Sequence, residues 1–244
     1  TAHKLMEKAS SLFENLYKCI RQTALGDPYK AADETYYKIL VPEKNSKGKG
    51  VRKGYLWVVV GINTRMIYLL YDDGSRSEKV ILNELGGCKG IIQSDGYSPY
   101  RKLESDAYPH ITRIPCLQHI KRKFIDCGED EPDAKRIVEL INTLYQNEHK
   151  HKIGVDGWTV EQNLVHRKKY APDILGEIKD VLDDIEERGD LLPKSELKEA
   201  VTYLRNEWNA VVDIFNYGDT YLDNNIVYPN FLVIQTYYCN HLII

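Results

Sequence analysis

The chain has 244 residues, 43% of them hydrophobic and 28% charged, which is typical of a globular protein with one substantial core and room for an attached helical lobe. Its formal net charge of −3 excludes a protein that grips nucleic acid through global positive charge, so any such contact needs local basic patches. The five cysteines form no CxxC pair, and no apolar run is long enough for a membrane span, which excludes a disulfide framework, a zinc knuckle and a membrane segment.

The first predicted element is an amphipathic helix. Residues 4–25 repeat apolar side chains at helical spacing, and we expect this face to pack on the core that follows. The chain begins in this pattern without an initiator methionine or a signal-peptide layout, which favours a piece of a longer protein. The apolar positions are Leu5, Ala9, Leu12, Leu16 and Ile20.

Three strands are predicted next. Residues 30–41 form the first, and the apolar runs 55–62 and 66–71 form a hairpin around a turn at 63–65. Between the first two strands, the Gly- and Lys-rich segment 44–54 predicts a mobile basic loop.

Helices and strands then alternate. Residues 76–85 suit a short helix, and 89–94 predict a buried strand that ends at Asp95. The carboxyl ends of strands are where open α/β sheets usually place their chemistry. A further strand near 110–114 leads into a basic segment at 116–124. We therefore expect a mixed sheet with helices.

From residue 133 onward the pattern is helical. Three amphipathic stripes of period 3.6 predict a helical lobe over 133–215, with Trp208 and Phe215 buried, and Pro172, Gly189 and Pro193 separating its helices. The stripes are Ile137, Leu140, Ile141 and Leu144, then Ile174, Ile178, Val181 and Ile185, and then Leu197, Val201, Leu204, Trp208, Val211 and Phe215.

Two acidic residues stand at the polar edges of apolar runs: Asp33 in ADETYYKIL at 32–40 and Asp95 in IIQSDGYSPY at 91–100. A lone Asp at a strand end is more often a turn former. Carboxylates brought together from separate strands, however, are what a two-metal phosphoryl-transfer site needs. We expect them on adjacent strands, close enough to share a cation, whereas Glu34 should face the opposite side of the sheet.

Six motifs in this order resemble the bacterial DDE transposases of insertion sequence 66, from about Leu5 to Val227. The motifs are ADET, GYLWVVV, IIQSDGYSPY, CLQHIKRKF, AVTYLRNEW and LDNN. The resemblance implies an α/β fold: a ribonuclease H-like core, with a mixed five-stranded sheet and helices, plus an inserted all-helical lobe. The expected segments are an amino-terminal helix at 1–29, the catalytic core at 30–130, the helical insertion at 131–218 and a remnant of the last catalytic segment at 219–244.

The resemblance also implies chemistry and partners. By motif match, Asp33 and Asp95 are the first two catalytic acids and metal ligands, and an intact site would hold two Mg²⁺ or Mn²⁺ ions for DNA cleavage and strand transfer. The expected partners are transposon ends and target DNA, in the bacterial cytoplasm, and the resemblance leaves open whether the chain forms a homo-oligomer. Full-length relatives carry further amino-terminal DNA-binding and zinc-binding segments.

The resemblance also singles out the basic start of a predicted helix, because the family keeps this segment near the active site. Its side chains are candidates for contact with DNA phosphates, which supply most non-specific affinity. For the histidine, a structural role is equally open. The residues are His119, Lys121, Arg122 and Lys123.

The third acid of the family is missing. Relatives have Asp-Asn-Asn, two residues and then Glu-Arg, whereas here the corresponding positions are Tyr228 and Pro229. No charged residue occurs in 226–244, and a proline inside the catalytic helix would cost roughly 3 kcal/mol or more. We interpret the tail as the product of a frameshift after Val227, with a divergent terminus as the alternative. We expect an irregular tail and weak or no activity.

Two other functions remain open at this stage. One is a non-catalytic remnant that binds DNA or a partner subunit, and the other is a ribonuclease H-like nuclease or resolvase. The discriminating observation is whether another carboxylate reaches the Asp33–Asp95 pair. Asp223 is nearest in sequence, but on a helix it would lie about 140° around the axis from position 228 and should point elsewhere.

Overall fold

The computed structural model describes residues 2–43, 48, 50–189 and 191–225. Its contacts divide the chain into two compact units. The first combines Thr1–Arg113 with Asn224–Ile244, and the second is Ile114–Asp223. The core boundary expected at residue 130 stays a prediction. No helix in the described part is long and apolar enough to cross a membrane.

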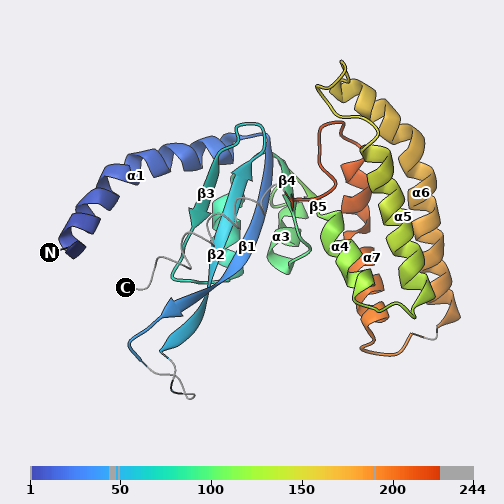
Figure 1. Cartoon of the computed structure of the whole chain (residues 1–244), viewed down its shortest axis with the longest axis horizontal. Coiled ribbons are helices and arrows are strands. Elements are labelled where there is room, and N and C mark those ends of the chain that lie inside the picture. Colours follow the sequence, from blue (N-terminus) through green and yellow to red (C-terminus); the bar gives the residue numbers. More distant parts are fainter. Residues whose placement is uncertain (1, 44–47, 49, 190, 226–244) are drawn as a thin grey trace. The chain divides into compact units, whose positions relative to one another are not determined.

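The first unit is built on a mixed five-stranded sheet, as the sequence predicted (Figure 1). The strand order is β3-β2-β1-β4-β5; β2 is antiparallel to both β1 and β3, and β4 is parallel to β1. Short helices α2 and α3 and the 3-10 turn η1 lie between the later strands. The bounds are β1 Tyr29–Leu40, β2 Val51–Gly61, β3 Ile67–Leu70, α2 Glu78–Leu85, β4 Gly90–Ser94, α3 Ser98–Arg101, η1 Lys102–Glu104 and β5 Ile111–Pro115.

The end of the predicted basic loop is a strand, which corrects one expectation. Residues 51–54 belong to β2, with Val51 opposite Leu40 and Gly54 opposite Tyr37. Backbone pairing along the twelve-residue β1 extends β2 further than its apolar run does. A Cβ on Gly54 would lie 2.3 Å from Ile39 Cδ1, so this glycine serves a close contact.

A glycine also fixes where β4 joins β1. Gly90 has φ of +89°, and a Cβ there would lie 2.2 Å from Pro28 O. Only glycine fits such an approach in the left-handed region. The Ile91 N–H then donates to Pro28 O at 2.8 Å, which starts the parallel pairing.

One face of the sheet carries the apolar core of this unit. Strand residues such as Trp57 and Ile92 pack there against α2 and α3, whose Ile81 and Tyr100 are fully buried. Burial of this kind contributes about 25 cal/mol per Å² of apolar surface. The core therefore fixes α2 and α3 over the face opposite the one that carries Asp33 and Asp95.

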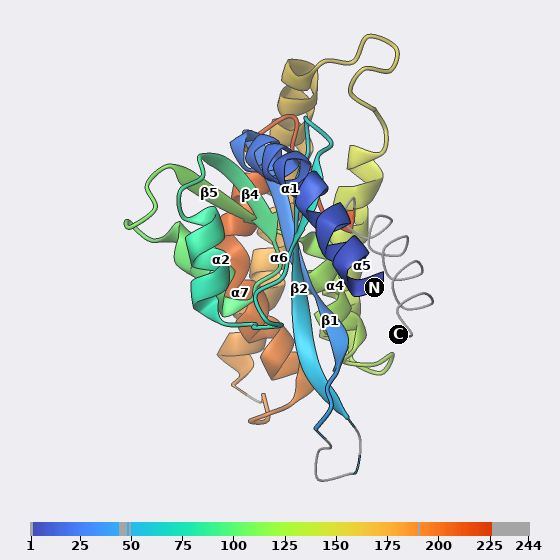
Figure 2. The same cartoon turned by 90° about the vertical axis from the view of Figure 1, so that its left-hand side faces the viewer.

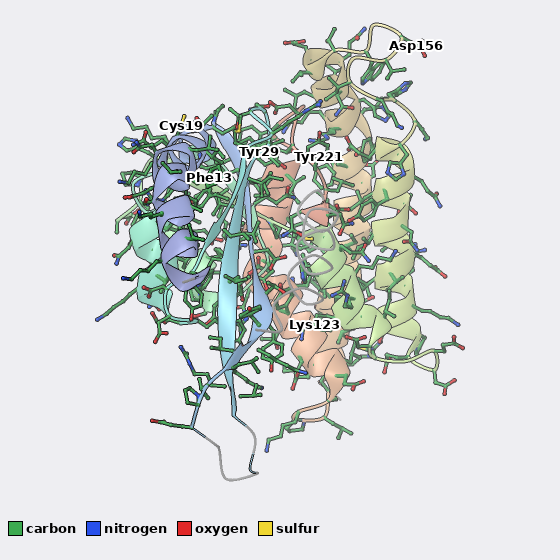
Figure 3. All side chains as sticks on the ribbon, turned by 60° about the vertical axis from the view of Figure 1, so that its left-hand side comes forward. Phe13, Cys19, Tyr29, Lys123, Asp156 and Tyr221 are labelled. Atoms are coloured by element: carbon green, nitrogen blue, oxygen red, sulfur yellow. The ribbon has the colours of Figure 1, made fainter. Side chains whose placement is uncertain are left out.

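The amino-terminal helix α1 (Ala2–Gly26) packs only by its second half, so the predicted packing is wrong for its first half, which projects away from the strands in Figure 1 and towards the viewer in Figure 2. Arg21 donates to both carboxylate oxygens of Glu84 at 2.7 Å, and Ala24 is buried. Leu5 and Leu12, by contrast, are 70% and 80% exposed. A helix of 25 residues is about 37 Å long and extends beyond β3, a strand of four residues. Figure 3 labels the exposed Phe13 and Cys19 on α1.

This exposure predicts a small mutational effect. Leu12→Gln should change the free energy of unfolding by no more than about 0.5 kcal/mol, because it alters a surface side chain. Ile81→Ala, the matched core variant, should cost about 2–5 kcal/mol because it opens a cavity. Urea unfolding measures both. A loss above 2 kcal/mol for Leu12→Gln would mean that the apolar stripe is packed.

The described residues of the second unit form four helices: α4 Leu117–Ile125, α5 Pro132–Glu148, α6 Val160–Arg188 and α7 Glu196–Ile214. Helix α5 packs on α6, and α4 packs on both α5 and α7. The three predicted apolar stripes are buried except at Val181 and Trp208, which are half-buried. Trp208 therefore corrects one prediction. The buried face of α7 includes the residue before Trp208, Glu207, which is fully buried.

Pro172 also differs from expectation, because it lies inside α6 rather than between helices. Its ring removes one helix hydrogen bond, at a cost of about 3 kcal/mol. Burial of Ile174, Leu175 and Ile178 directly after it offsets that cost.

Candidate functional site

The two predicted acids belong to neighbouring strand segments of the sheet. Asp33 is on β1, Asp95 directly follows β4, and the parallel register pairs Ala31 with Gln93. Extending this register by two residues places Asp33 opposite Asp95, and directly opposed residues share a face of the sheet. The predicted adjacency of the strands is confirmed. The role of the two side chains as metal ligands and catalytic acids stays a prediction.

The Asp33 side chain is buried, with 7% of the residue exposed, so its ionised form is poorly solvated. Burial raises the pKa of its carboxyl group to about 7, and the negative charges of Asp95 and then Glu34 add to this effect. The Glu34 N–H donates to Asp33 Oδ1 at 2.8 Å and opposes the rise. A carboxyl group that ionises with difficulty beside a second carboxylate is stabilised by a cation.

Asp95 is held by its local turn. The Tyr97 N–H donates to Asp95 Oδ1 at 3.0 Å, and Arg113 Nη1 donates to the Asp95 carbonyl oxygen at 3.3 Å. Arg113 is buried and forms an ion pair with Glu104. The backbone that carries Asp95 is thus fixed from two sides, which positions its carboxylate.

Glu34 faces the other side of the sheet, as predicted, since it pairs with Trp57 whereas Asp33 pairs with Val58. Its carboxylate accepts from Arg76 Nε at 3.0 Å and from the Tyr100 hydroxyl at 3.2 Å. Burial and then the charge of Asp95 raise the Glu34 carboxyl pKa, against the lowering effect of Arg76. Through these contacts the Glu34 carboxylate attaches α3 and the loop that contains Arg76 to β1.

The structure adds a residue that sequence reasoning missed. Asn224 is 0% exposed, and its Nδ2 lies 3.5 Å from Asp33 Oδ2. Asn224 Oδ1 has no hydrogen-bond partner among the described residues. The signal in the sequence is the LDNN motif, in which the uncharged Asn224 directly follows the charged Asp223.

Within the part of the chain that the structure describes, no other carboxylate completes the pair. The Asp223 carboxylate accepts from the Tyr145 hydroxyl at 2.9 Å within the helical unit. Among the described residues, no group of three or more His, Cys, Asp or Glu side chains could hold a metal ion. Tyr228, Pro229 and the predicted irregular tail lie outside the residues that the structure describes.

The basic residues of the predicted DNA contact lie on α4 in the second unit. Arg122 and Lys123 are exposed, whereas His119 and Lys121 are half-buried (Figure 3 labels Lys123). The Lys121 and Lys123 ammonium groups lie 6.0 and 5.9 Å from the ring centroids of Tyr145 and Tyr203. The charges of the exposed Arg122 and Lys123 are accessible at the helix surface, and contact of the four residues with DNA stays a prediction.

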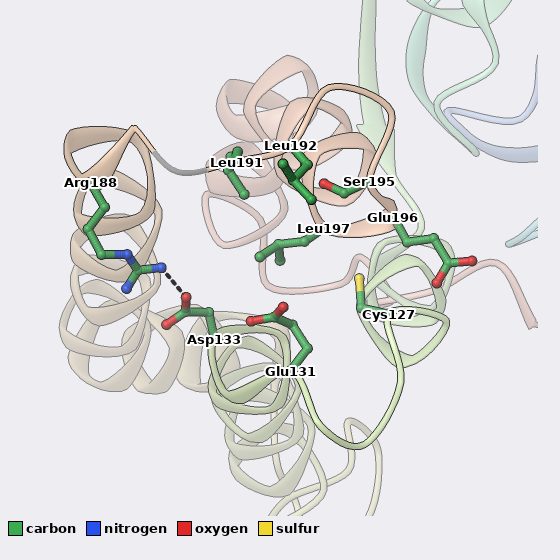
Figure 4. Close-up of a pocket in the computed structure, with 9 residues that line it drawn as sticks. All are labelled: Cys127, Glu131, Asp133, Arg188, Leu191, Leu192, Ser195, Glu196 and Leu197. Atoms are coloured by element: carbon green, nitrogen blue, oxygen red, sulfur yellow. Dashed lines mark hydrogen bonds and ion pairs between the residues drawn. The ribbon is translucent and has the colours of Figure 1, made fainter.

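A cavity of about 310 Å³ lies at one end of the helical unit (Figure 4). Leu191, Leu192 and Leu197 line it together with acidic side chains, and Arg188 forms an ion pair with Asp133 at its rim. None of the predicted site residues lines this cavity, so it is separate from the chemistry of the aspartates.

Comparison with known proteins identifies the family. The chain is 28% identical over 160 residues to "Uncharacterized protein y4jD" of Sinorhizobium fredii (strain NBRC 101917 / NGR234), covering 63% of this chain and 30% of that protein. It is 26% identical over 211 residues to "Uncharacterized protein y4qI" of the same organism, covering 80% of this chain and 37% of that protein. The chain thus spans about a third of these relatives' length. Because the model of the Transposase IS66 family matches residues 1–228, the chain belongs to that family.

Proposed function

We propose that this chain carries the catalytic core of a transposase that cleaves DNA strands and transfers them with the help of a divalent metal. The observation that carries the proposal is that Asp33 lies on β1 and Asp95 directly follows β4, the parallel strand beside it. Membership of a DDE transposase family implies, in general terms, divalent-metal use and DNA binding. Cleavage, strand transfer and DNA partners of the whole protein are part of the proposal.

The residues fit a hard divalent cation such as Mg²⁺ or Mn²⁺. Asp33 and Asp95 would hold it through carboxylate oxygens, the donors that such ions prefer. When bound, metal ions of this kind stabilise the attacking and leaving oxygens of an in-line phosphoryl displacement. The protein's own contribution is to orient the two carboxylates, through the Tyr97 N–H on Asp95 and the Glu34 N–H on Asp33.

We further propose that catalysis is impaired in this chain. The family's third acid would stand at position 228, which is Tyr here, and Pro229 replaces the following Arg. Because only two of the three carboxylate ligands are present, ion binding is weaker and the second metal position lacks a ligand. The basic side chains of α4 would contribute phosphate contacts.

Cleavage assays on DNA that carries transposon ends test both statements. The chain as it stands should give no detectable strand transfer with Mg²⁺. A variant with Tyr228→Glu and Pro229→Arg and an in-frame tail like that of relatives should cleave, and adding Asp33→Ala or Asp95→Ala should abolish cleavage. Asp72→Asn, at an exposed position, is the matched control. Robust cleavage by the unmodified chain, abolished by Asp33→Ala, would show that the missing Glu is dispensable.

A non-catalytic remnant that binds DNA or a partner is the second candidate. It is favoured by one observation: the described residues contain no group of three acidic or other metal-binding side chains. It predicts DNA binding in a mobility-shift assay without cleavage even by the restored variant. A nuclease or resolvase of the same fold is less well supported, because the family model that matches is that of a transposase.

A further inference from the structure

We infer that Asn224 completes a site for a single divalent cation with Asp33 and Asp95, with its side-chain oxygen as the third protein ligand. The inference rests on the proposed function, because it assumes that the two aspartates hold a cation. It goes beyond that proposal by assigning a residue outside the acidic set of the family.

The first argument is the buried amide of Asn224. The side chain is 0% exposed, and its Oδ1 has no hydrogen-bond partner among the described residues. Buried polar atoms are nearly always paired, so such an atom calls for an explanation by an ion or a water. The Nδ2 contact to Asp33 Oδ2, at 3.5 Å, is too long to fix the amide strongly.

The second argument comes from the two orientations of this amide. With Nδ2 towards Asp33, the oxygen is left without a partner. Rotation by 180° would instead bring Oδ1 towards Asp33 Oδ2, and the two oxygen atoms would repel each other. A cation between them turns that repulsion into coordination, since amide and carboxylate oxygens are both ligands of hard cations. A cation would therefore favour the flipped orientation, in which Oδ1 faces Asp33.

The third argument is charge. Two ionised aspartates and one neutral amide sum to −2, which matches one divalent cation. Asp33 and Asp95 contribute from β1 and from the end of β4, and Asn224 comes from a distant part of the chain that belongs to the same compact unit. Oxygen ligands alone suit Mg²⁺ and Mn²⁺ rather than metals that prefer sulfur or imidazole.

Titration of the chain with Mn²⁺ alone at pH 8, followed by electron paramagnetic resonance and calorimetry, tests the inference. Asn224→Ala and the near-isosteric Asn224→Leu should weaken Mn²⁺ binding at least about tenfold, the lower end for even an outer-sphere partner. Asn224→Asp should keep or tighten binding. Asn225→Ala, at the exposed neighbouring position, should stay within about twofold of the parent chain. Addition of Mg²⁺ should shift the NMR signal of the Asn224 side-chain amide.

The outcomes separate the inference from the proposed function. Circular dichroism checks that each variant is folded. If Asn224→Leu does not fold, Mn²⁺ binding by Asn224→Asp is measured instead. If Asp33→Ala abolishes Mn²⁺ binding and Asn224→Leu leaves it unchanged, the inference is overturned and the role of the aspartates stands. If the parent chain binds no Mn²⁺, the inference also fails, and cleavage by the restored variant then decides the proposed function independently.

Discussion

Glu148→Ala should lower the free energy of unfolding by about 3–5 kcal/mol, because it leaves a guanidinium buried without its carboxylate. Arg167 is 1% exposed, and its Nη2 lies 2.7 Å from Glu148 Oε1. The same guanidinium donates to the Tyr217 carbonyl oxygen at 2.6 Å and to the Thr220 hydroxyl at 2.8 Å. This one side chain therefore ties the segment after α7 to α5 and α6.

The matched control replaces both partners of this ion pair. Because a buried ion pair pays desolvation on both sides, Glu148→Leu combined with Arg167→Met should recover much of the loss. Urea unfolding followed by circular dichroism measures all variants. If Glu148→Ala costs less than 1 kcal/mol, Arg167 is solvated in solution and the buried network described above is wrong.

The second large effect is on the pH dependence of stability. The Asp33 pKa is raised from 3.8 to about 7 in the folded protein, so the unfolded chain releases this proton at lower pH than the folded one. The folded state then binds more protons between pH 4 and 7, and stability falls as pH rises through this window. A shift of about 3 units corresponds to at most on the order of 4 kcal/mol.

Asp33→Asn removes this titration. The variant should match the parent chain near pH 4 and be more stable than it at pH 8, in metal-free buffer. Unfolding at both pH values measures the difference, with Asp72→Asn as the exposed control. Mg²⁺ should narrow the gap by favouring the ionised parent carboxylate. Parallel pH profiles for the parent and Asp33→Asn would contradict the assigned burial of this carboxyl group.

The sequence predicted the positions of the helices and strands better than it predicted which of their faces are covered by other elements. Period-2 and period-3.6 patterns place the strands and the helical lobe, and the motif edges place Asp33 and Asp95 on adjacent strands. Periodicity reports which face of a helix is apolar, but not whether another element covers it. The first half of α1 is therefore exposed where packing was expected, and Glu207 lies on the buried face of α7 beside Trp208.

Asn224 escaped prediction for a different reason. An amide has no charge and no periodic signature, so its meaning depends on what lies next to it. Asp33, its hydrogen-bond neighbour, is 191 positions away in the chain. Only the folded arrangement places its oxygen in a buried position near an acidic pair.

The long ribbon of β1 and β2 has a consequence for how two copies of this molecule meet. Pairing of β1 with β4 stops at Ala31, whereas pairing with β2 continues to Leu40, so within the described strands the rest of β1 has an open edge. Open edges invite strand addition by a neighbouring molecule and hence aggregation. Lys38 and Lys53, which lie opposite each other, place positive charge on this ribbon, and the repulsion between like-charged copies opposes such pairing.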